Sequence, residues 1–157
     1  MLAGRVETEL LGELGAEKIG SVDRPLCREL TANLLDGQVA DAVMTVSAET
    51  ANVVSVGIQL NDAEGNALAV RGSVLAYLSD DANGDSIATT APDGGVAIDT
   101  DGLLIPIVAN KAFQLVSEAD GDIDLTVTET GDATWYLIIV LPTGLLLASD
   151  AITMTAA

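Results

Sequence analysis

From about residue 40 onward, apolar and polar residues alternate with a period of two. The clearest runs are 54–60, in which the apolar residues are separated by Ser55, Gly57 and Gln59, and 123–128. Successive side chains of a β-strand point to opposite faces, so this period is typical of strands that bury one face. Similar runs predict eight to ten short strands, for which the candidate segments are 43–48, 54–60, 68–78, 87–90, 96–98, 103–108, 113–117, 123–128, 135–141, 145–147 and 151–155.

The run 135–141 has no polar face. One side of this predicted strand carries Trp135, Leu137, Ile139 and Leu141, and the other carries Tyr136, Ile138 and Val140. We call these seven residues the apolar β-face. Since apolar surface is favourable only when it is removed from water, both sides of the strand should be covered. We expect the second side to be covered by the N-terminal part of the chain or by another copy.

Turn signals separate the predicted strands. The segment 61–66 predicts a polar hairpin turn between 54–60 and 68–78, with Gly72 as a possible bulge, and Pro142-Thr143-Gly144 predicts a second reversal. Helical crossovers are absent from this part of the pattern. The sequence therefore predicts an all-β fold, an antiparallel Greek-key sandwich of the immunoglobulin-like type, with a jelly roll as the alternative.

The first 48 residues have a different pattern. Apolar residues recur at helical spacing around residues 6–14 and 26–34, and Pro25 and Gly37 bracket the second run as helix start and stop signals. We predict a partly helical or extended arm over 1–48 and a β-sandwich over 49–157. The arm is either a surface helix pair on its own domain or an anchor on a neighbouring subunit. The contact residues of an anchor would be Val6, Leu10, Leu11, Leu14, Leu26, Leu30 and Leu34.

Composition narrows the function. The chain has 24 acidic and 6 basic residues, a net charge of −18, and no histidine. Nucleic acid is a poor partner, because its binding depends on Lys and Arg neutralising phosphates. Catalysis by Ser-His-Asp or Cys-His and the usual zinc sites require histidine. Cys27 is the single cysteine, so no intrachain disulfide can form.

Neither end of the chain suggests a membrane or an export signal. Charged residues interrupt the apolar residues of 1–20, unlike the apolar core of a signal peptide. The most apolar window, 137–148, contains a Pro-x-Gly turn and is shorter than the ~20 residues that a membrane helix needs. We expect synthesis in the cytoplasm and no contact with a membrane.

Two acidic clusters invite a calcium interpretation. Asp81, Asn83 and Asp85 match the first ligand positions of an EF-hand loop, but Ser86 and Pro92 stand where that loop needs Gly and Glu. This excludes an EF-hand. Aspartate and glycine are also the residues that β-turns require, so solvated turns are the favoured interpretation.

The second cluster lies around residues 120–124. Asp122 and Asp124 would share the solvent face of a strand, with Ile123 on the other side. Nothing in the sequence selects a catalytic carboxylate pair, and Trp135 lies in an apolar strand rather than on a sugar-binding platform. We therefore expect no catalytic residue, no metal and no cofactor.

The segment 53–155 resembles small structural proteins of tailed bacteriophages. The resemblance is carried by VVSVGIQLNDAEGNALAVRGSVLAYLS, by GGVAIDTDGLLI, and by SEADGDIDLTVTETGDATWYLIIVLPTGLLLAS, with their turns D-x-x-G-N, D-G, E-A-D-G-D-I and W-Y-L-x-x-x-L-P-x-G. These patterns also resemble bacterial immunoglobulin-like modules. Residues 1–48 lie outside the resemblance.

The phage resemblance implies a non-enzymatic structural protein of a virion, most simply a capsid decoration or cementing protein of the head-fibre type on the capsid exterior. Its expected partners are the major capsid protein or other virion subunits and further copies of itself. The alternative is an immunoglobulin-like binding module of a tail or surface protein that recognises a host receptor or a glycan.

Overall fold

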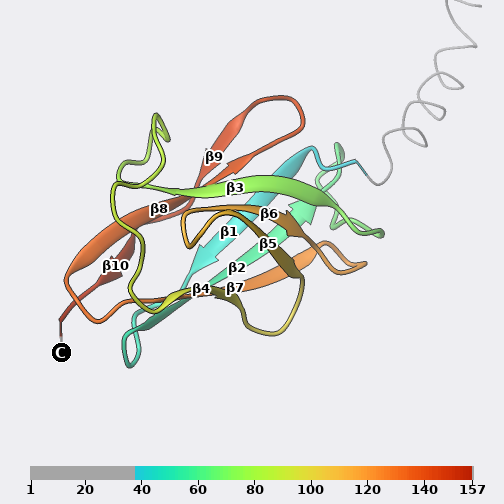
Figure 1. The fold of residues 1–157 in the computed structure, drawn as a ribbon. Coiled ribbons are helices and arrows are strands. Elements are labelled where there is room, and N and C mark those ends of the chain that lie inside the picture. Colours follow the sequence, from blue (N-terminus) through green and yellow to red (C-terminus); the bar gives the residue numbers. More distant parts are fainter. Residues whose placement is uncertain (1–37, 157) are drawn as a thin grey trace, which may run out of the picture. The chain divides into compact units, whose positions relative to one another are not determined.

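A computed structural model describes residues 38–156, and in these residues the fold is entirely β (Figure 1). No helix long and apolar enough to cross a membrane occurs in this part of the chain. The strands are β1 (Asp41–Val46), β2 (Val53–Asn61), β3 (Ser73–Ser79), β4 (Gly95–Ile98), β5 (Leu103–Val108), β6 (Ala112–Val116), β7 (Asp122–Thr128), β8 (Ala133–Val140), β9 (Leu146–Ala148) and β10 (Ile152–Met154).

The strands form two antiparallel sheets, which confirms the predicted sandwich. One is four-stranded, in the order β1-β2-β7-β4. The other is six-stranded, in the order β10-β8-β3-β6-β5, with β9 beside β10 on the same edge of β8. Neighbours such as β2 and β7, or β3 and β6, are distant in sequence, because the chain crosses repeatedly between the sheets. These are Greek-key connections, which immunoglobulin-like sandwiches and jelly rolls both contain.

The core lies between the sheets and is filled by the alternate residues that the period-two pattern marks. On β7 the inward residues Ile123, Leu125 and Val127 are at most 1% exposed. The six-stranded sheet contributes Phe113 and Trp135 to the same cluster. Both sheets therefore bury one face against the other, as the sequence predicts, with only partly buried residues such as Met44 and Leu104 on the edge strands.

The predicted hairpin between 54–60 and 68–78 is wrong, although its turn is correct. Asp62 accepts hydrogen bonds from the backbone N–H groups of Glu64 and Asn66, which closes the turn. After a single bridge at Ala67, however, the chain crosses to the other sheet, and β3 pairs with β6 and β8. Gly72 lies at this crossing. A Cβ at this position would lie only 2.6 Å from Leu68 Cδ1, so close packing requires a glycine here, and Gly72 does not form a bulge.

The sandwich begins earlier than the predicted boundary at residue 49. β1 (Asp41–Val46) pairs with β2 along its whole length. The end of the predicted arm, 41–46, therefore belongs to the four-stranded sheet. Cys27 and the seven arm residues from Val6 to Leu34 lie outside the described residues.

One predicted strand does not form. The segment 87–90 lies in the connection between the two sheets and forms no strand. Individual hydrogen bonds hold it in place. The backbone N–H of Ala88 donates to the carbonyl of Leu78, and Asp80 accepts hydrogen bonds from the backbone and the hydroxyl of Thr89. The predicted strand at the C-terminal end does form, as edge strand β10.

Candidate functional site

Large apolar side chains lie in a row on the outer face of the six-stranded sheet. The strand register aligns Ile105 of β5 with Gln114 of β6, Leu75 of β3, Val140 of β8 and Leu146 of β9. Ile105, Leu75 and Leu146 are 47%, 38% and 41% exposed. Gln114, whose amide donates to the Ser73 hydroxyl, is the polar member of the row.

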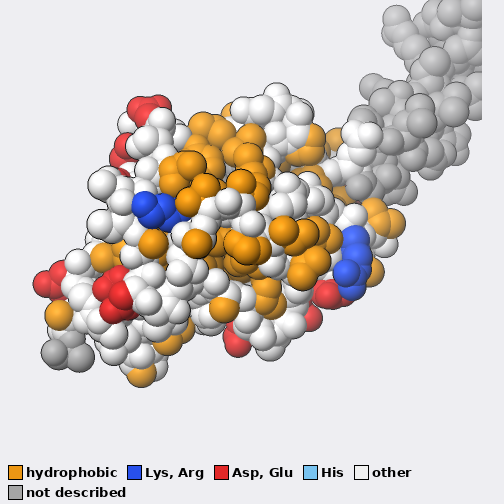
Figure 2. Space-filling view, viewed as in Figure 1, with side chains coloured by type: hydrophobic (Ala, Val, Ile, Leu, Met, Phe, Trp, Pro, Cys, Tyr) orange, Lys and Arg blue, Asp and Glu red, His pale blue; other side chains and the backbone are white. Residues whose placement is uncertain are grey.

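A second row of outward side chains lies two residues further along the strands. The register places Leu103 beside Val116 and Val116 beside Ser73. Figure 2 shows hydrophobic side chains gathered across the middle of this side of the sandwich, with acidic side chains at its margins. We call the set Leu75, Leu103, Ile105, Gln114, Val116, Val140 and Leu146 the outer apolar face. Such a surface is unusual, because the outer side of an antiparallel sheet is normally polar.

A loop covers one end of this surface. The Tyr77 hydroxyl donates to the carbonyl of Gly84, and a Cβ at Gly84 would lie 3.2 Å from the side chain of Ile138. Segment 80–86 therefore lies on the outer side of β3 and β8. Ile138, which points away from the core, is buried as a result.

The apolar β-face predicted from sequence is thus divided among three environments. The side chains of Trp135, Leu137, Ile139 and Leu141 belong to the core cluster. On the other side Ile138 lies under the chain's own loop, Tyr136 is half-buried, and Val140 belongs to the outer apolar face. The loop over Ile138 is a cover that the sequence did not suggest, since we expected the arm or another copy.

Charged groups border the outer apolar face at its two ends. At the start of β3, Arg71 pairs with Glu118 at 2.6 Å. At the other end lie the acidic loop 80–86 and Lys111, whose ammonium donates to the carbonyl of Thr89 at 2.7 Å. One end of the face is therefore net negative, with Lys111 among the acidic residues of loop 80–86, and the other end carries the Arg71–Glu118 ion pair.

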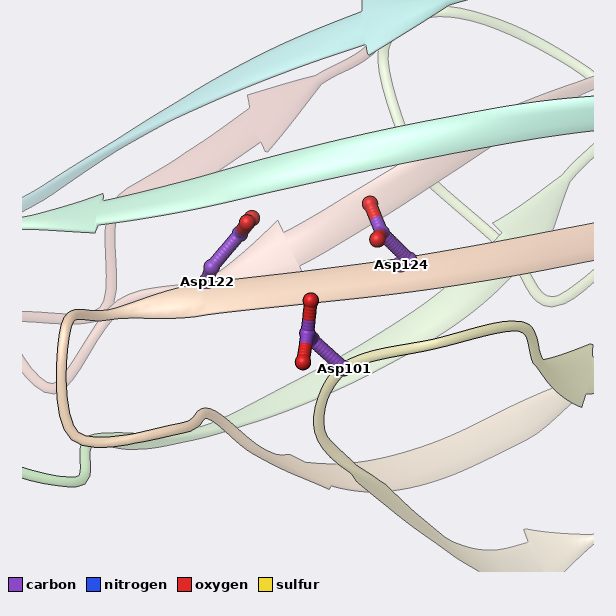
Figure 3. Close-up of side chains that lie close together, drawn as sticks. All are labelled: Asp101, Asp122 and Asp124. Carbon is purple, nitrogen blue, oxygen red and sulfur yellow. The ribbon is translucent and has the colours of Figure 1, made fainter.

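Three carboxylates lie together on the opposite side of the molecule, on the four-stranded sheet. Figure 3 shows Asp122 and Asp124 projecting from the same side of β7, with Asp101 reaching them from the loop before β5. One carboxylate oxygen from each residue lies within 4.8 Å of those of the other two. The shared strand face of Asp122 and Asp124 was predicted. No sequence pattern indicates Asp101, because only the tertiary fold brings its loop alongside β7.

The electrostatics of this acidic triad oppose full ionisation. Burial raises the pKa of Asp122 above its usual value, and the neighbouring charge of Asp124 raises it further. Asp124 accepts a hydrogen bond from the Thr100 hydroxyl. Three carboxylates supply only part of the six to eight oxygen ligands that calcium takes, and exposed acidic groups occur in proteins without any ion. We assign no ligand to the triad.

The other acidic loop is a turn. Asp81 accepts hydrogen bonds from the backbone N–H groups of Asn83 and Gly84. Gly84 has a φ of +71°, a conformation that glycine adopts readily. The carboxylate of Asp81 thus closes a turn that carries Gly84 over Ile138, in agreement with the interpretation of this cluster as turn residues.

Sequence reasoning missed most of the outer apolar face. A signal was present in 103–108, where six consecutive residues, LLIPIV, are apolar although the strand lies at a sheet edge. Five of the six are exposed. An edge strand without polar residues was the clue, but the sequence alone did not show that 103–108 is an edge.

Comparison with known proteins does not identify a family. No model of a known protein family matches this chain, and no characterised protein sequence matches it. Among solved structures, the chain is similar to a cohesin module from a family 33 glycoside hydrolase of Clostridium perfringens, with 8% sequence identity and a TM-score of 0.34 over 76% of this chain and 96% of the module. A likeness at this level supports no statement about function.

Proposed function

We propose that this protein is a non-enzymatic structural protein that acts by adhesion, as a decoration or cementing protein on the capsid surface of a tailed bacteriophage. The observation that carries the proposal is the outer apolar face, exposed on a sandwich that is otherwise strongly acidic. Contiguous apolar surface of this kind marks interaction sites, because its exposure to water costs free energy that binding recovers.

The arrangement of the face favours adhesion over recognition of a small ligand. Its residues lie on five neighbouring strands of one sheet, so they form a broad surface held by backbone hydrogen bonds. Small-molecule sites are concave and enclose their ligand. A broad sheet face instead suits another protein surface, such as a capsid subunit or a sister copy.

The choice of a virion rests on the resemblance of residues 53–155 to phage structural proteins. A shell protein in many copies benefits from strong like charge on its remaining surface, because that charge discourages aggregation. In this proposal the acidic loops face solvent, and the leucines of residues 1–36 supply a second attachment.

Co-sedimentation with phage heads tests the proposed function. Heads that assemble without this protein are incubated with the purified full chain and pelleted, alongside a variant that lacks residues 1–35. We expect the full chain to pellet with the heads in saturable amounts, and the truncated variant to remain folded but to pellet in much smaller amounts, because it keeps the outer apolar face and lacks the second attachment.

Two results would contradict this proposal. A full chain that never pellets with heads, yet binds host cells or a glycan array saturably, would establish the alternative of a receptor-binding module. A truncated variant that decorates heads fully would remove the arm from the mechanism.

A further inference from the structure

The geometry points to a second copy of this chain as the occupant of the outer apolar face. We propose that two sandwiches associate face to face through this surface, related by a two-fold axis that runs across the strands. The inference rests on the proposed function, because it names the sister copy as the adhesion partner of this surface.

Charge distribution favours a self-contact at this surface of the described sandwich. Arg71 and Lys111 are the basic residues of 38–156, so most surfaces of two copies would meet as like charges. The outer apolar face contains no charged residue. Two copies can therefore approach closely there without bringing carboxylates together in the centre of the contact.

The charges at the two ends of the face select the direction of the axis. Arg71 precedes β3 and the acidic loop 80–86 follows it, so they lie at opposite ends of the same strand. An axis running across the strands places the acidic loop of one copy, with Lys111 near it, against the Arg71–Glu118 pair of the other. An axis along the strands would instead bring together the two ends that carry the acidic loops, each net negative even with Lys111, which costs free energy.

With the axis across the strands, each residue of the central row lies opposite the same residue of the other copy. Ile105 would lie opposite Ile105, and Leu75 opposite Leu75. Gln114 would also meet Gln114, and a side-chain amide has both donors and an acceptor, so two such amides can pair across the axis. The one polar residue in the row is therefore compatible with burial in the contact.

Pairing along the sheet edge is a less suitable way to associate. β5 is an edge strand, but Pro106 has no N–H to donate, and the register of β5 shifts between Pro106 and Val108. Proline and bulges in edge strands impede the addition of another strand. The apolar side chains of β5 are thus available for a face contact, while its backbone is poorly suited to extend the sheet.

The size of the face predicts a weak association. The face spans five strands about 4.8 Å apart and about three residues along each strand, which gives a footprint on the order of 200 Å². Typical specific complexes bury about 800 Å² on each partner. We therefore expect a weak dimer whose population depends on protein concentration.

Sedimentation equilibrium of the full chain tests the proposed dimer. We expect a reversible dimer in the wild type and a dissociation constant at least about tenfold higher in Ile105→Glu, because two glutamates would then face each other across the axis. Val43→Glu is the matched control, since Val43 is 53% exposed on β1 of the other sheet, and it should dimerise as the wild type does. Circular dichroism confirms that both variants are folded.

Charge rescue tests the axis itself. Ile105→Lys should also impair self-association, whereas an equimolar mixture of Ile105→Glu and Ile105→Lys should form a heterodimer at least as tight as the wild-type dimer. A contact in which Ile105 faces a different residue would give no preference for the mixed dimer, and this result would overturn the proposed axis.

The outcomes separate this inference from the proposed function. A wild type that is monomeric at all concentrations, or oligomers that Ile105→Glu leaves intact, would overturn the dimer even if the chain still pellets with phage heads. A dimer that behaves as expected in a chain that never binds heads would leave the inference standing and remove the virion role.

Discussion

The two sheets of this sandwich have the same inner chemistry and opposite outer chemistry. On the four-stranded sheet the outer positions of β2 and β7 are, apart from Val53, polar or small, among them Ser55, Asp122, Asp124 and Thr126. On the six-stranded sheet the corresponding positions include Leu75, Leu103, Ile105, Val140 and Leu146. The outer face of the four-stranded sheet is therefore polar, as is usual, and the outer face of the six-stranded sheet is apolar enough to bind protein.

The comparison of the two sheets shows that different residues of this sandwich serve stability and association. Most inward residues of both sheets are buried, and they determine the fold. Outward residues contribute little to folding, so their identity is free to serve association. Ile138 is the exception, because it points outward and is nevertheless buried under a loop.

The largest expected effect comes from truncating the buried side chain of Ile138. Ile138→Ala should destabilise the protein by about 2 kcal/mol or more, because it leaves a cavity beneath segment 80–86. Thr126→Ala, on the outer face of the other sheet, should change the stability by about 0.5 kcal/mol or less. Urea unfolding measures both values. Equal, small changes would show that the loop does not cover Ile138.

A smaller effect is expected where Tyr77 holds the loop. Tyr77→Phe removes the hydrogen bond to the Gly84 carbonyl and should cost about 1 kcal/mol. Hydrogen exchange should rise in 80–86 and stay unchanged in β7. Unchanged protection of the loop would mean that packing alone holds it.

The pH dependence of Tyr77 gives a second measurement of the same contact. Burial raises the pKa of Tyr77 above 10.0, and the charges of Asp85 and Asp81 add to this effect. The folded state therefore favours the neutral phenol, and this stabilisation is present below pH 10 and lost as the pH rises through the folded pKa. Between neutral pH and a pH above 10, the free energy of unfolding should fall less in Tyr77→Phe than in the wild type. A wild type and variant with parallel alkaline profiles would contradict this assignment.

The smallest expected effect lies on the polar face. Asp122→Asn removes a carboxylate whose pKa burial and Asp124 raise, so the variant should be slightly more stable at neutral pH, by about 0.5 kcal/mol or less. Below pH 3.8 the gain should vanish, because Asp122 is then protonated in both folded and unfolded chains. Thermal melts at pH 7 and pH 3 test this. Destabilisation at neutral pH would mean that the carboxylate has a structural partner.

Much of the fold followed from the sequence because the period-two pattern reports local burial. It marked Ile123, Leu125 and Val127 as inward residues and placed the strands at 54–60, 103–108 and 135–141 close to their observed bounds. It failed at the β2–β3 connection, where a turn of ordinary hairpin type leads into a sheet crossing. Turn residues describe the local backbone, and they do not specify the sheet that the next strand joins.

The candidate site was harder to predict for the same reason. The sequence marked Tyr136, Ile138 and Val140 as an apolar second face, but it contained no information on which of them a loop would cover. The row from Ile105 to Leu146 joins strands from three separate parts of the chain, and the triad joins Asp101 to a strand that begins at Asp122. Strand register and sheet order create both features.

The sequence by itself determined the all-β class, the inward residues and the acidic character of this protein, since these depend on residue type and on spacing within one strand. The tertiary structure alone decided that apolar side chains of five strands form one outer face, that segment 80–86 covers Ile138, and that three aspartates meet beside β7. These features depend on which strands become neighbours, and that choice results from the packing of the whole core.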